Sequence, residues 1–304
     1  MEMVLYRGES GAVTAFAAHC SHMGCHLVHG RVVGDNLQCA LHHRVIGPGG
    51  GFVGRDGNIL PDQWQPRFPV IERFGSIFVY AGIKPAFDLP APAIAEAGPV
   101  ATRCLKPTSF AVPWVTLVAN GTDMDHLQAV HDRSLRQPAT LEKLDRWRLR
   151  FSYRARATGS HLGDRLMKWL SGDDIDTSIT FSGGSMVFVE SRVRRWRTFV
   201  ILSMCPTAEG GSVVRGVVGI AGAPQRLRMR GALRLTTWLF RSFLDEDVGV
   251  LGGMQWHEPH HALTPGDHLT RRLCCHFRSL PEFSPPASRD ADARPADAYS
   301  RASA

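Results

Sequence analysis

The chain has 304 residues, of which 44% are hydrophobic, and it carries a formal net charge of +7. Its length suffices for one large domain or two moderate ones, and its composition is that of an ordinary globular protein. No stretch reaches the roughly 18 apolar residues of a membrane-spanning helix, and no signal peptide is visible. The positive charge is spread along the chain without a nucleic-acid-binding motif, so we expect no nucleic-acid partner.

The number and distribution of the cysteines indicate the redox state of the compartment in which the protein works. There are 7 of them, an odd number, and they are scattered along the chain. This pattern argues against a disulfide framework. We therefore expect a reducing, cytoplasmic setting.

The first part of the chain, residues 1–84, is predicted to be a small antiparallel β domain. Apolar stretches alternate there with Gly and Pro, the residues that mark turns. Strands are expected at Val13–Ala17, Arg31–Val33, Asn36–Gln38, Pro69–Arg73 and Ile77–Tyr80.

Two short motifs within this domain each pair one thiol with one imidazole. Cys20 and His22 form Cys-x-His, and Cys39 and His42 form Cys-x-x-His. Two cysteines and two histidines in this order suit a [2Fe–2S] cluster in which sulfur binds one iron and imidazole the other. A Cys₂His₂ zinc site uses the same residue types and stays open as the alternative.

The stretch CSHMGCHLVHGRVVGDNLQCALHH resembles the Rieske family. In Rieske proteins of respiratory complexes, a cysteine at the position of Cys25 pairs with a second one where this chain has Leu41. The pattern is therefore closer to the Rieske domain of ring-hydroxylating oxygenases. It departs from them at His43-Arg44, where those enzymes usually carry Gly-Trp. Only 19 residues precede Cys20, so either this domain is pared down or the reading frame begins upstream.

Residues 85–105, rich in Pro and Ala, are the predicted linker to a second domain, residues 106–280. Near its start, a helix is predicted over residues 120–131. Asp123 and His126 are three residues apart and share a face of such a helix, whereas His131 would leave that face unless the helix ends or bulges. Two ordinary helix histidines are the simpler interpretation of this segment taken alone.

This segment, Asn-x-x-Asp-x-x-His-x(4)-His, also resembles the iron motif of Rieske oxygenase large subunits. The resemblance implies that His126 and His131 bind a mononuclear Fe(II) with one carboxylate, in a facial triad that leaves positions open for O₂. It places Asn120 near the iron without making it a firm ligand. It also implies that Asp123 carries electrons between subunits, by linking His126 to His42 of a neighbouring chain in a homotrimer. A carboxylate that only orients His126 is the structural alternative.

A long helix is predicted from Pro224 to Met254, and the carboxylate ligand of the iron is expected on it. On a helical wheel Asp247 lies within an apolar stripe, and an unpaired buried charge there would be costly. The stripe consists of Phe240, Phe243, Val250, Leu251 and Met254. Asp247 is thus the predicted third ligand, and Glu246 is the reserve candidate.

Between these segments, alternating stretches predict an antiparallel sheet that the long helix crosses. The strands are expected at Arg148–Ala157, Thr177–Phe181, Met186–Val193, Arg197–Cys205 and Ser212–Ala221. The predicted class is α+β: a Rieske [2Fe–2S] antiparallel β domain followed by a helix-grip, START-like catalytic domain. Four side chains are candidates for lining its hollow: Trp169, Met186, Phe188 and Trp238. Residues 281–304, poor in apolar residues, are predicted to be a disordered tail.

The resemblance implies an oxygenase component that uses O₂ and electrons from a NAD(P)H-dependent reductase, directly or through a ferredoxin. Its substrate would be small and apolar, aromatic or steroid-like, and hydroxylation and demethylation both fit. Arginine-rich stretches at 192–197 and 226–234 suit an acidic electron donor, but also plain solubility or anionic lipid. The alternatives are a Rieske electron carrier or binding protein with an inactive second domain, and a zinc-bound regulatory protein.

Overall fold

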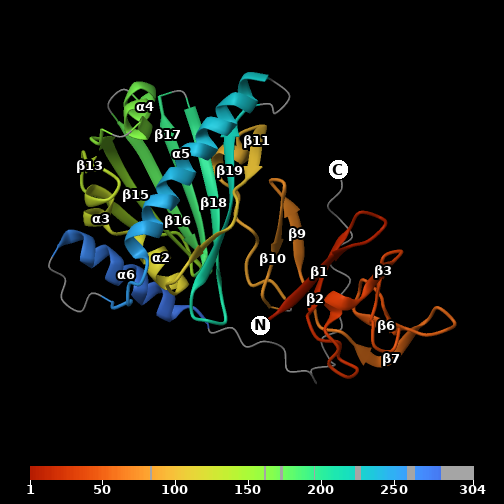
Figure 1. The fold of residues 1–304 in the computed structure, drawn as a ribbon. Coiled ribbons are helices and arrows are strands. Elements are labelled where there is room, and N and C mark those ends of the chain that lie inside the picture. The colour runs from red at the N-terminus through yellow and green to blue at the C-terminus, as the bar shows by residue number, and fades with distance from the viewer. Residues whose placement is uncertain are drawn as a thin grey trace. The chain divides into compact units, whose positions relative to one another are not determined.

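In the computed structural model, the described residues are 1–82, 84–160, 162–171, 174–194, 196–222, 227–258 and 264–281. They fall into two compact units, Met1–Asp88 and Leu89–Pro281, which are described separately below (Figure 1). The tail predicted for residues 281–304 lies, from residue 282 onward, outside the described residues.

The first unit consists of short antiparallel strands. One sheet has the order β1-β2-β8, a second has the order β3-β4-β5-β6-β7, and β9 pairs with β10. The strands are β1 Met3–Arg7, β2 Val13–Ala17, β3 Arg31–Val33, β4 Asn36–Gln38, β5 Val45–Ile46, β6 Gly51–Val53, β7 Ile59–Trp64, β8 Arg67–Phe68, β9 Val70–Arg73 and β10 Ser76–Val79; a short 3₁₀ helix covers Leu27–His29.

The second unit is organised around one long antiparallel sheet. Its order is β11-β19-β18-β17-β16-β15-β13, with β12 paired to β19 and β14 paired to β15. The strands are β11 Val100–Cys104, β12 Thr108–Phe110, β13 Arg133–Leu135, β14 Thr140–Lys143, β15 Arg148–Ala157, β16 Ile175–Ser182, β17 Met186–Val193, β18 Trp196–Pro206 and β19 Ser212–Ala221.

The longest helix, α5, lies obliquely across one face of this sheet (Figure 1), and the short α1 lies at the other face, where the Ile94 N–H donates to Glu190. The helices are α1 Ala93–Glu96, α2 Trp114–Asn120, α3 Met124–Ala129, α4 Leu162–Ser171, α5 Leu227–Leu251 and α6 Pro265–Ser279. Helix α6 begins with a capping box, in which Thr264 and Asp267 satisfy each other's backbone N–H groups, and Pro265 follows the cap.

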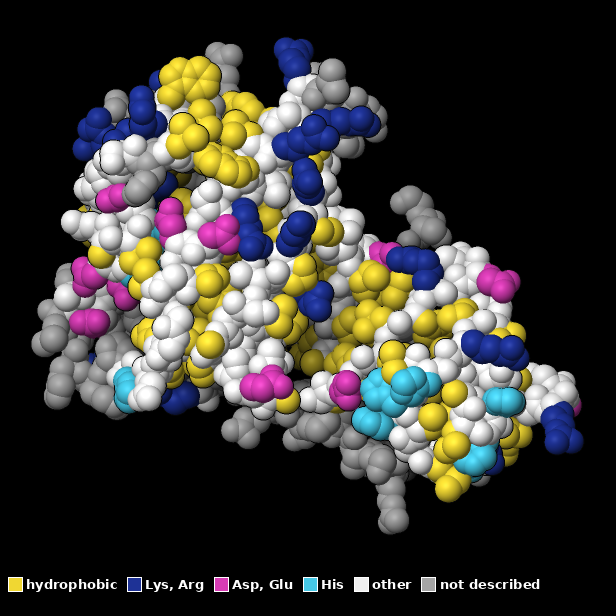
Figure 2. All heavy atoms as spheres, viewed as in Figure 1, with side chains coloured by type: hydrophobic (Ala, Val, Ile, Leu, Met, Phe, Trp, Pro, Cys, Tyr) yellow, Lys and Arg dark blue, Asp and Glu magenta, His cyan; other side chains and the backbone are white. Residues whose placement is uncertain are grey.

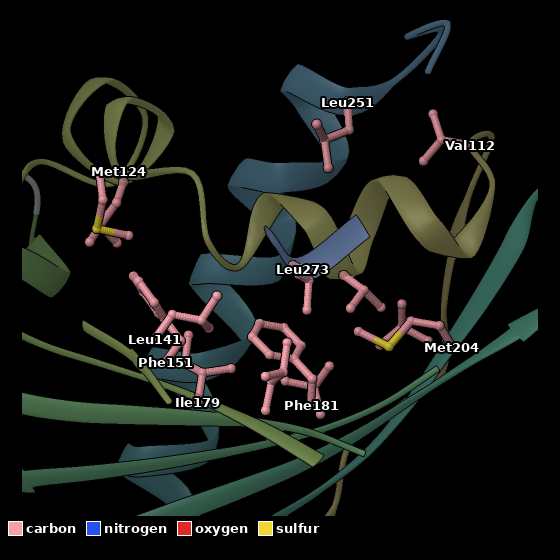
Figure 3. Packing of buried hydrophobic residues seen from close by; sticks show 14 of the residues in the cluster. Val112, Met124, Leu141, Phe151, Ile179, Phe181, Met204, Leu251 and Leu273 are labelled. Carbon is pink, nitrogen blue, oxygen red and sulfur yellow. The ribbon is translucent and has the colours of Figure 1, made fainter. Parts of the chain in front are cut away.

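A hydrophobic core fills the space between the sheet and the helices. In Figure 3, Ile179 and Phe181 point from the sheet toward Leu273 of α6, and Met124 and Leu251 reach the same cluster from α3 and α5. Phe181 and Leu273 are fully buried. This packing fixes α3 and α5, which carry the candidate ligands, against the strands.

The predicted α+β class is confirmed, and the strands expected in both units are present with small shifts of their ends. One local prediction is wrong. Residues 120–131 do not form a single helix, because α2 ends at Asn120 and α3 runs only from Met124 to Ala129. The predicted linker, residues 85–105, contains helix α1 and strand β11, which pairs with β19.

None of the helices in the described ranges is long and apolar enough to cross a membrane. Figure 2 shows basic side chains (dark blue) gathered over the amino-terminal end of α5, where Arg228, Arg230 and Arg234 are exposed. The basic surface expected from the second arginine-rich stretch is therefore present over the described residues 228–234.

Replacing Leu273 by Ala should lower the free energy of unfolding of the second unit by about 2–5 kcal/mol, because the side chain is fully buried and leaves a cavity. Chemical denaturation monitored by circular dichroism measures this. The matched control is Leu162→Ala, since Leu162 is 72% exposed in α4 and should cost less than about 0.5 kcal/mol. Equal effects of the two substitutions would contradict the packing described here.

Candidate metal centres and cavity

Two helices and a loop bring three potential metal ligands together in the second unit. His126 lies in α3, His131 follows the end of that helix, and Asp247 lies in the last turns of α5. Asp247 Oδ1 is 3.0 Å from His126 Nε2 and 3.1 Å from His131 Nε2, and the two nitrogens are 3.2 Å apart. Helix α3 ends at Ala129, two residues before His131. This helix end, one of the two predicted possibilities, allows the His131 ring to lie beside His126.

These separations match a facial arrangement around a divalent cation. First-row divalent ions bind imidazole nitrogen and carboxylate oxygen at about 2.0–2.2 Å. Neighbouring octahedral ligands at right angles are then about 2.8–3.1 Å apart, whereas tetrahedral ligands are about 3.3–3.6 Å apart. The observed 3.0–3.2 Å is closer to the octahedral value. The group thus resembles a mononuclear iron site.

The charge of this group also favours a cation. Burial raises the pKa of Asp247, but hydrogen bonds and charges from His126 and His131 outweigh it and hold the pKa below its usual range. Burial lowers the pKa of His131, yet Asp247 and then Glu246 outweigh it and raise the pKa above the ordinary value. Asp247 thus places an ionised carboxylate beside two imidazoles in a largely buried group, and a divalent cation would compensate this charge.

Glu246 holds one of the ligands in place. Its Oε2 lies 2.8 Å from His131 Nδ1, so the other ring nitrogen is left to face Asp247. A carboxylate on the second nitrogen fixes the tautomer and orientation of a metal-binding histidine. The Glu246 side chain is 44% exposed, yet its carboxylate reaches the His131 ring. Sequence reasoning considered Glu246 only as a reserve ligand and missed this orienting role.

Aromatic and basic groups complete the support of His131. The Phe243 ring stacks on the His131 ring, with centroids 4.3 Å apart and planes 21° apart. The Arg133 guanidinium lies over the Phe243 ring, 5.0 Å from its centroid. Its Nη1 donates to the His131 carbonyl at 2.8 Å.

The apolar stripe predicted for the long helix is only partly present. Phe240, Phe243 and Leu251 face inward, but Val250 is 55% exposed and Met254 is 42% exposed.

Asn120 and Asp123 both lie beside the ligand group, in different roles. Asn120 Nδ2 is 3.0 Å from His126 Nε2 and 3.4 Å from Asp247 Oδ1. Asp123 is the N-cap of α3, and its Oδ1 accepts a hydrogen bond from the His126 backbone N–H at 2.9 Å. Among the described contacts, Asp123 therefore reaches the backbone of His126 and not its ring.

The break between α2 and α3 is itself anchored. Thr122, which is fully buried, lies in this break, and its hydroxyl is 3.1 Å from that of Thr270 in α6. Thr122 also donates to the Ala119 carbonyl at 2.9 Å. Helix α6, which the sequence did not predict, thus braces the segment that carries His126.

A cavity of about 270 Å³ opens beside the three ligands, between α5 and the sheet. Its lining is mostly apolar, and α5 contributes residues spaced three or four apart from Thr236 to Leu251. The four side chains expected to line a hollow, Trp169, Met186, Phe188 and Trp238, are not among the described lining residues. Trp169 is 74% exposed, and Met186 and Phe188 point to the other face of β17.

In the first unit, two loops bring the four cluster-motif residues together. Cys20 and Cys39 are buried in one hydrophobic cluster, whereas His22 and His42 are exposed. The rings of His22 and His42 lie edge to face, with centroids 4.8 Å apart. Two inner thiols and two outer imidazoles are the donor set that a Rieske cluster requires, with the imidazoles on the solvent side.

The two ligand thiols differ: burial and the neighbouring Cys39 raise the pKa of Cys20, whereas the surroundings of Cys39 favour its thiolate. Burial raises the pKa of Cys39, but the N–H groups of Leu41 and His42 and the thiols of Cys25 and Cys20 outweigh it and lower the pKa. Such donors stabilise a thiolate, the form that binds metal. All of these cysteines are free thiols, as expected from Leu41 in place of a second loop cysteine.

A buried glutamine braces the first loop. Gln65 is 2% exposed; its Oε1 accepts from the Ser21 N–H at 2.8 Å, and its Nε2 donates to the Ala17 and His19 carbonyls. No spacing rule in the sequence pointed to this residue, which lies more than forty positions from the loop it holds.

Comparison with known proteins agrees with this geometry. Residues 1–56 match the family model of the Rieske [2Fe–2S] domain. The chain is 30% identical over 139 residues to the cholesterol 7-desaturase nvd of Bombyx mori, covering 44% of this chain and 30% of that protein. It is 32% identical over 101 residues to a probable 3-ketosteroid-9-alpha-monooxygenase, oxygenase component, of Rhodococcus rhodochrous, covering 32% and 25%. The chain is a homologue of Rieske oxygenase components.

The solved structure of dicamba monooxygenase bound to dicamba has the same fold, with a TM-score of 0.67 at 18% identity over 91% of this chain and 88% of the other. The alignments with the two curated relatives span less than a third of each relative's length. The chain therefore contains a Rieske [2Fe–2S] domain and shares its fold with the dicamba monooxygenase structure.

Replacing Glu246 by Gln should weaken Fe(II) binding at the second centre by about 10–100-fold, because His131 loses the carboxylate that orients its ring. Anaerobic Fe(II) titration measures this affinity. Asp245→Asn is the matched control, since the neighbouring Asp245 pairs with Arg241 and contacts no ligand among the described residues. Unchanged affinity in the Glu246 variant would contradict the orienting role.

Proposed function

We propose that this chain is the catalytic component of a Rieske non-haem iron oxygenase acting on a small apolar substrate. One observation carries the proposal: the ligand atoms of His126, His131 and Asp247 converge within 3.2 Å of one another at the wall of a largely apolar cavity. A Rieske domain in the same chain supports it.

Each group of residues has a defined task in this proposal. Cys20, His22, Cys39 and His42 hold the [2Fe–2S] cluster, and His126, His131 and Asp247 hold Fe(II), with Asn120 beside it. When bound, these groups supply one-electron transfer and activation of O₂. The apolar lining binds the substrate and keeps water from the ligand group, while Glu246 and Phe243 fix the His131 ring.

Partners and compartment form part of the proposal. Electrons come from NAD(P)H through a reductase, with or without a ferredoxin, and an acidic donor would suit the exposed arginines of α5. A homotrimer, in which Asp123 of one copy hydrogen-bonds His42 of a neighbouring copy, would connect the two centres. The free thiols suit a reducing cytoplasm. The product is a hydroxylated or demethylated molecule.

His126→Ala should remove the mononuclear iron and abolish substrate-dependent O₂ consumption, because only two of the three ligands remain. Iron analysis should fall from about three to about two atoms per chain, while the visible absorption of the cluster stays unchanged. His268→Ala, an exposed histidine of α6, is the control and should keep all three. Two irons per chain in the unmodified protein would favour the electron-carrier alternative.

Asp123→Asn should keep both metal centres yet slow turnover by at least about tenfold. Asn is as good an N-cap as Asp, so α3 and His126 should stay in place while the carboxylate charge is lost. Stopped-flow oxidation of the reduced cluster by O₂ in the presence of substrate measures the step. Asp125→Asn is the control on the same helix turn, and normal rates in the Asp123 variant would refute its role in electron transfer.

A further inference from the structure

One row of hydroxyl groups crosses the apolar wall of the cavity. Tyr153, Thr177, Ser191 and Thr198 occupy paired positions on the adjacent strands β15, β16, β17 and β18. All four line the cavity. With strands about 4.8 Å apart, this hydroxyl row extends about 14 Å across the sheet.

On these four strands, the hydroxyl groups that line the cavity are confined to this row. The next row on the same face, two residues along each strand, consists of Phe151, Ile179, Val189 and Val200. Strand positions on the same face two residues apart have similar surroundings, so packing alone would favour apolar side chains in both rows. Thr177 is buried and therefore calls for a hydrogen-bonding partner, and Tyr153, Ser191 and Thr198 are half-buried beside it.

The hydroxyls satisfy one another only weakly. Thr177 Oγ1 is 3.4 Å from Ser191 Oγ, and Thr198 Oγ1 donates to the Ser191 carbonyl, also at 3.4 Å. Good O–H···O bonds measure about 2.5–3.0 Å. Burial raises the pKa of Tyr153, although a hydrogen bond with Thr177 opposes it, so the phenol remains a neutral donor. The row thus retains capacity to bind an oxygen atom of a ligand.

The surroundings favour a neutral oxygen over a carboxylate. Among the described lining residues, Arg133 is the cation apart from the histidines, and its Nη1 already donates to the His131 and Asp132 carbonyls. Asp123 and Asp247 also line the cavity, so an anion would meet like charge.

We infer that the substrate is an apolar molecule with a neutral carbonyl or hydroxyl oxygen, and that the hydroxyl row binds this oxygen while the apolar part extends toward the metal ligands. Thr177 and Ser191, at the centre of the row, are then specificity-determining residues. The inference rests on the proposed function only in taking this cavity as the substrate site.

The test compares two probes of one carbon skeleton, α-tetralone and tetralin, by calorimetric titration of the iron-loaded protein under nitrogen and without reductase. A single net hydrogen bond changes affinity by about three- to tenfold. The unmodified protein should bind the ketone tighter by about this factor. Thr177→Val should remove most of the preference, with the affinity for tetralin unchanged, and Ser191→Ala should act in the same direction.

Thr180→Val is the matched control: the same substitution, in the same strand and at the same 7% exposure, but on the opposite face of the sheet. It should leave the ketone preference intact. Equal binding of ketone and hydrocarbon by the unmodified protein would overturn the inference. So would equal effects of the two Thr→Val variants, or tighter binding of tetralin-2-carboxylate than of the ketone. Iron content and O₂ consumption test the oxygenase proposal separately, since neither depends on the ketone preference.

Discussion

The close approach of one carboxylate to two imidazoles is the constraint on which the second unit depends. The pKa of Asp247 stays below its usual range, although the side chain is only 17% exposed, because His126 and His131 face it from two sides. Holding three ligand atoms about 3 Å apart without letting solvent in requires rigid supports on every side. The core between α5, α6 and the sheet supplies them, and the ring of Phe243 and the carboxylate of Glu246 supply the last restraints on His131.

The candidate metal ligands could be predicted from the sequence, because their residue types and short spacings follow from metal chemistry. Cys20, His22, Cys39 and His42 are recognisable because ligand loops keep their spacing, and His126 and His131 because one segment carries both. Asp247 was found because a charge in an apolar stripe needs a partner. All seven lie where the proposed centres need them, although their binding of iron stays a prediction.

Long-range supports could not be predicted in the same way. Gln65 and Glu246 act on residues more than forty and one hundred positions away, and no local pattern marks such pairs. Helix α3 was too short to show a reliable period, so the break before Met124 was missed. Met186 and Phe188 were named as candidates for the lining of the hollow, with core packing as the commoner role, and they lie on the other face of their strand. The alternation of β17 was recognisable, but which of its faces the helix covers depends on the whole sheet.

The brace between Thr122 and Thr270 has a consequence for biosynthesis. The ligand segment near residue 126 emerges from the ribosome long before α6, which spans Pro265–Ser279 and is among the last described parts of the chain. The hydrophobic cluster around the Rieske loops consists of residues of the first unit, and domains generally fold as units, the N-terminal one first, during synthesis. The proposed iron centre is therefore completed only after α6 has been synthesised, and a chain that terminated before Pro265 would lack the anchor that holds this segment.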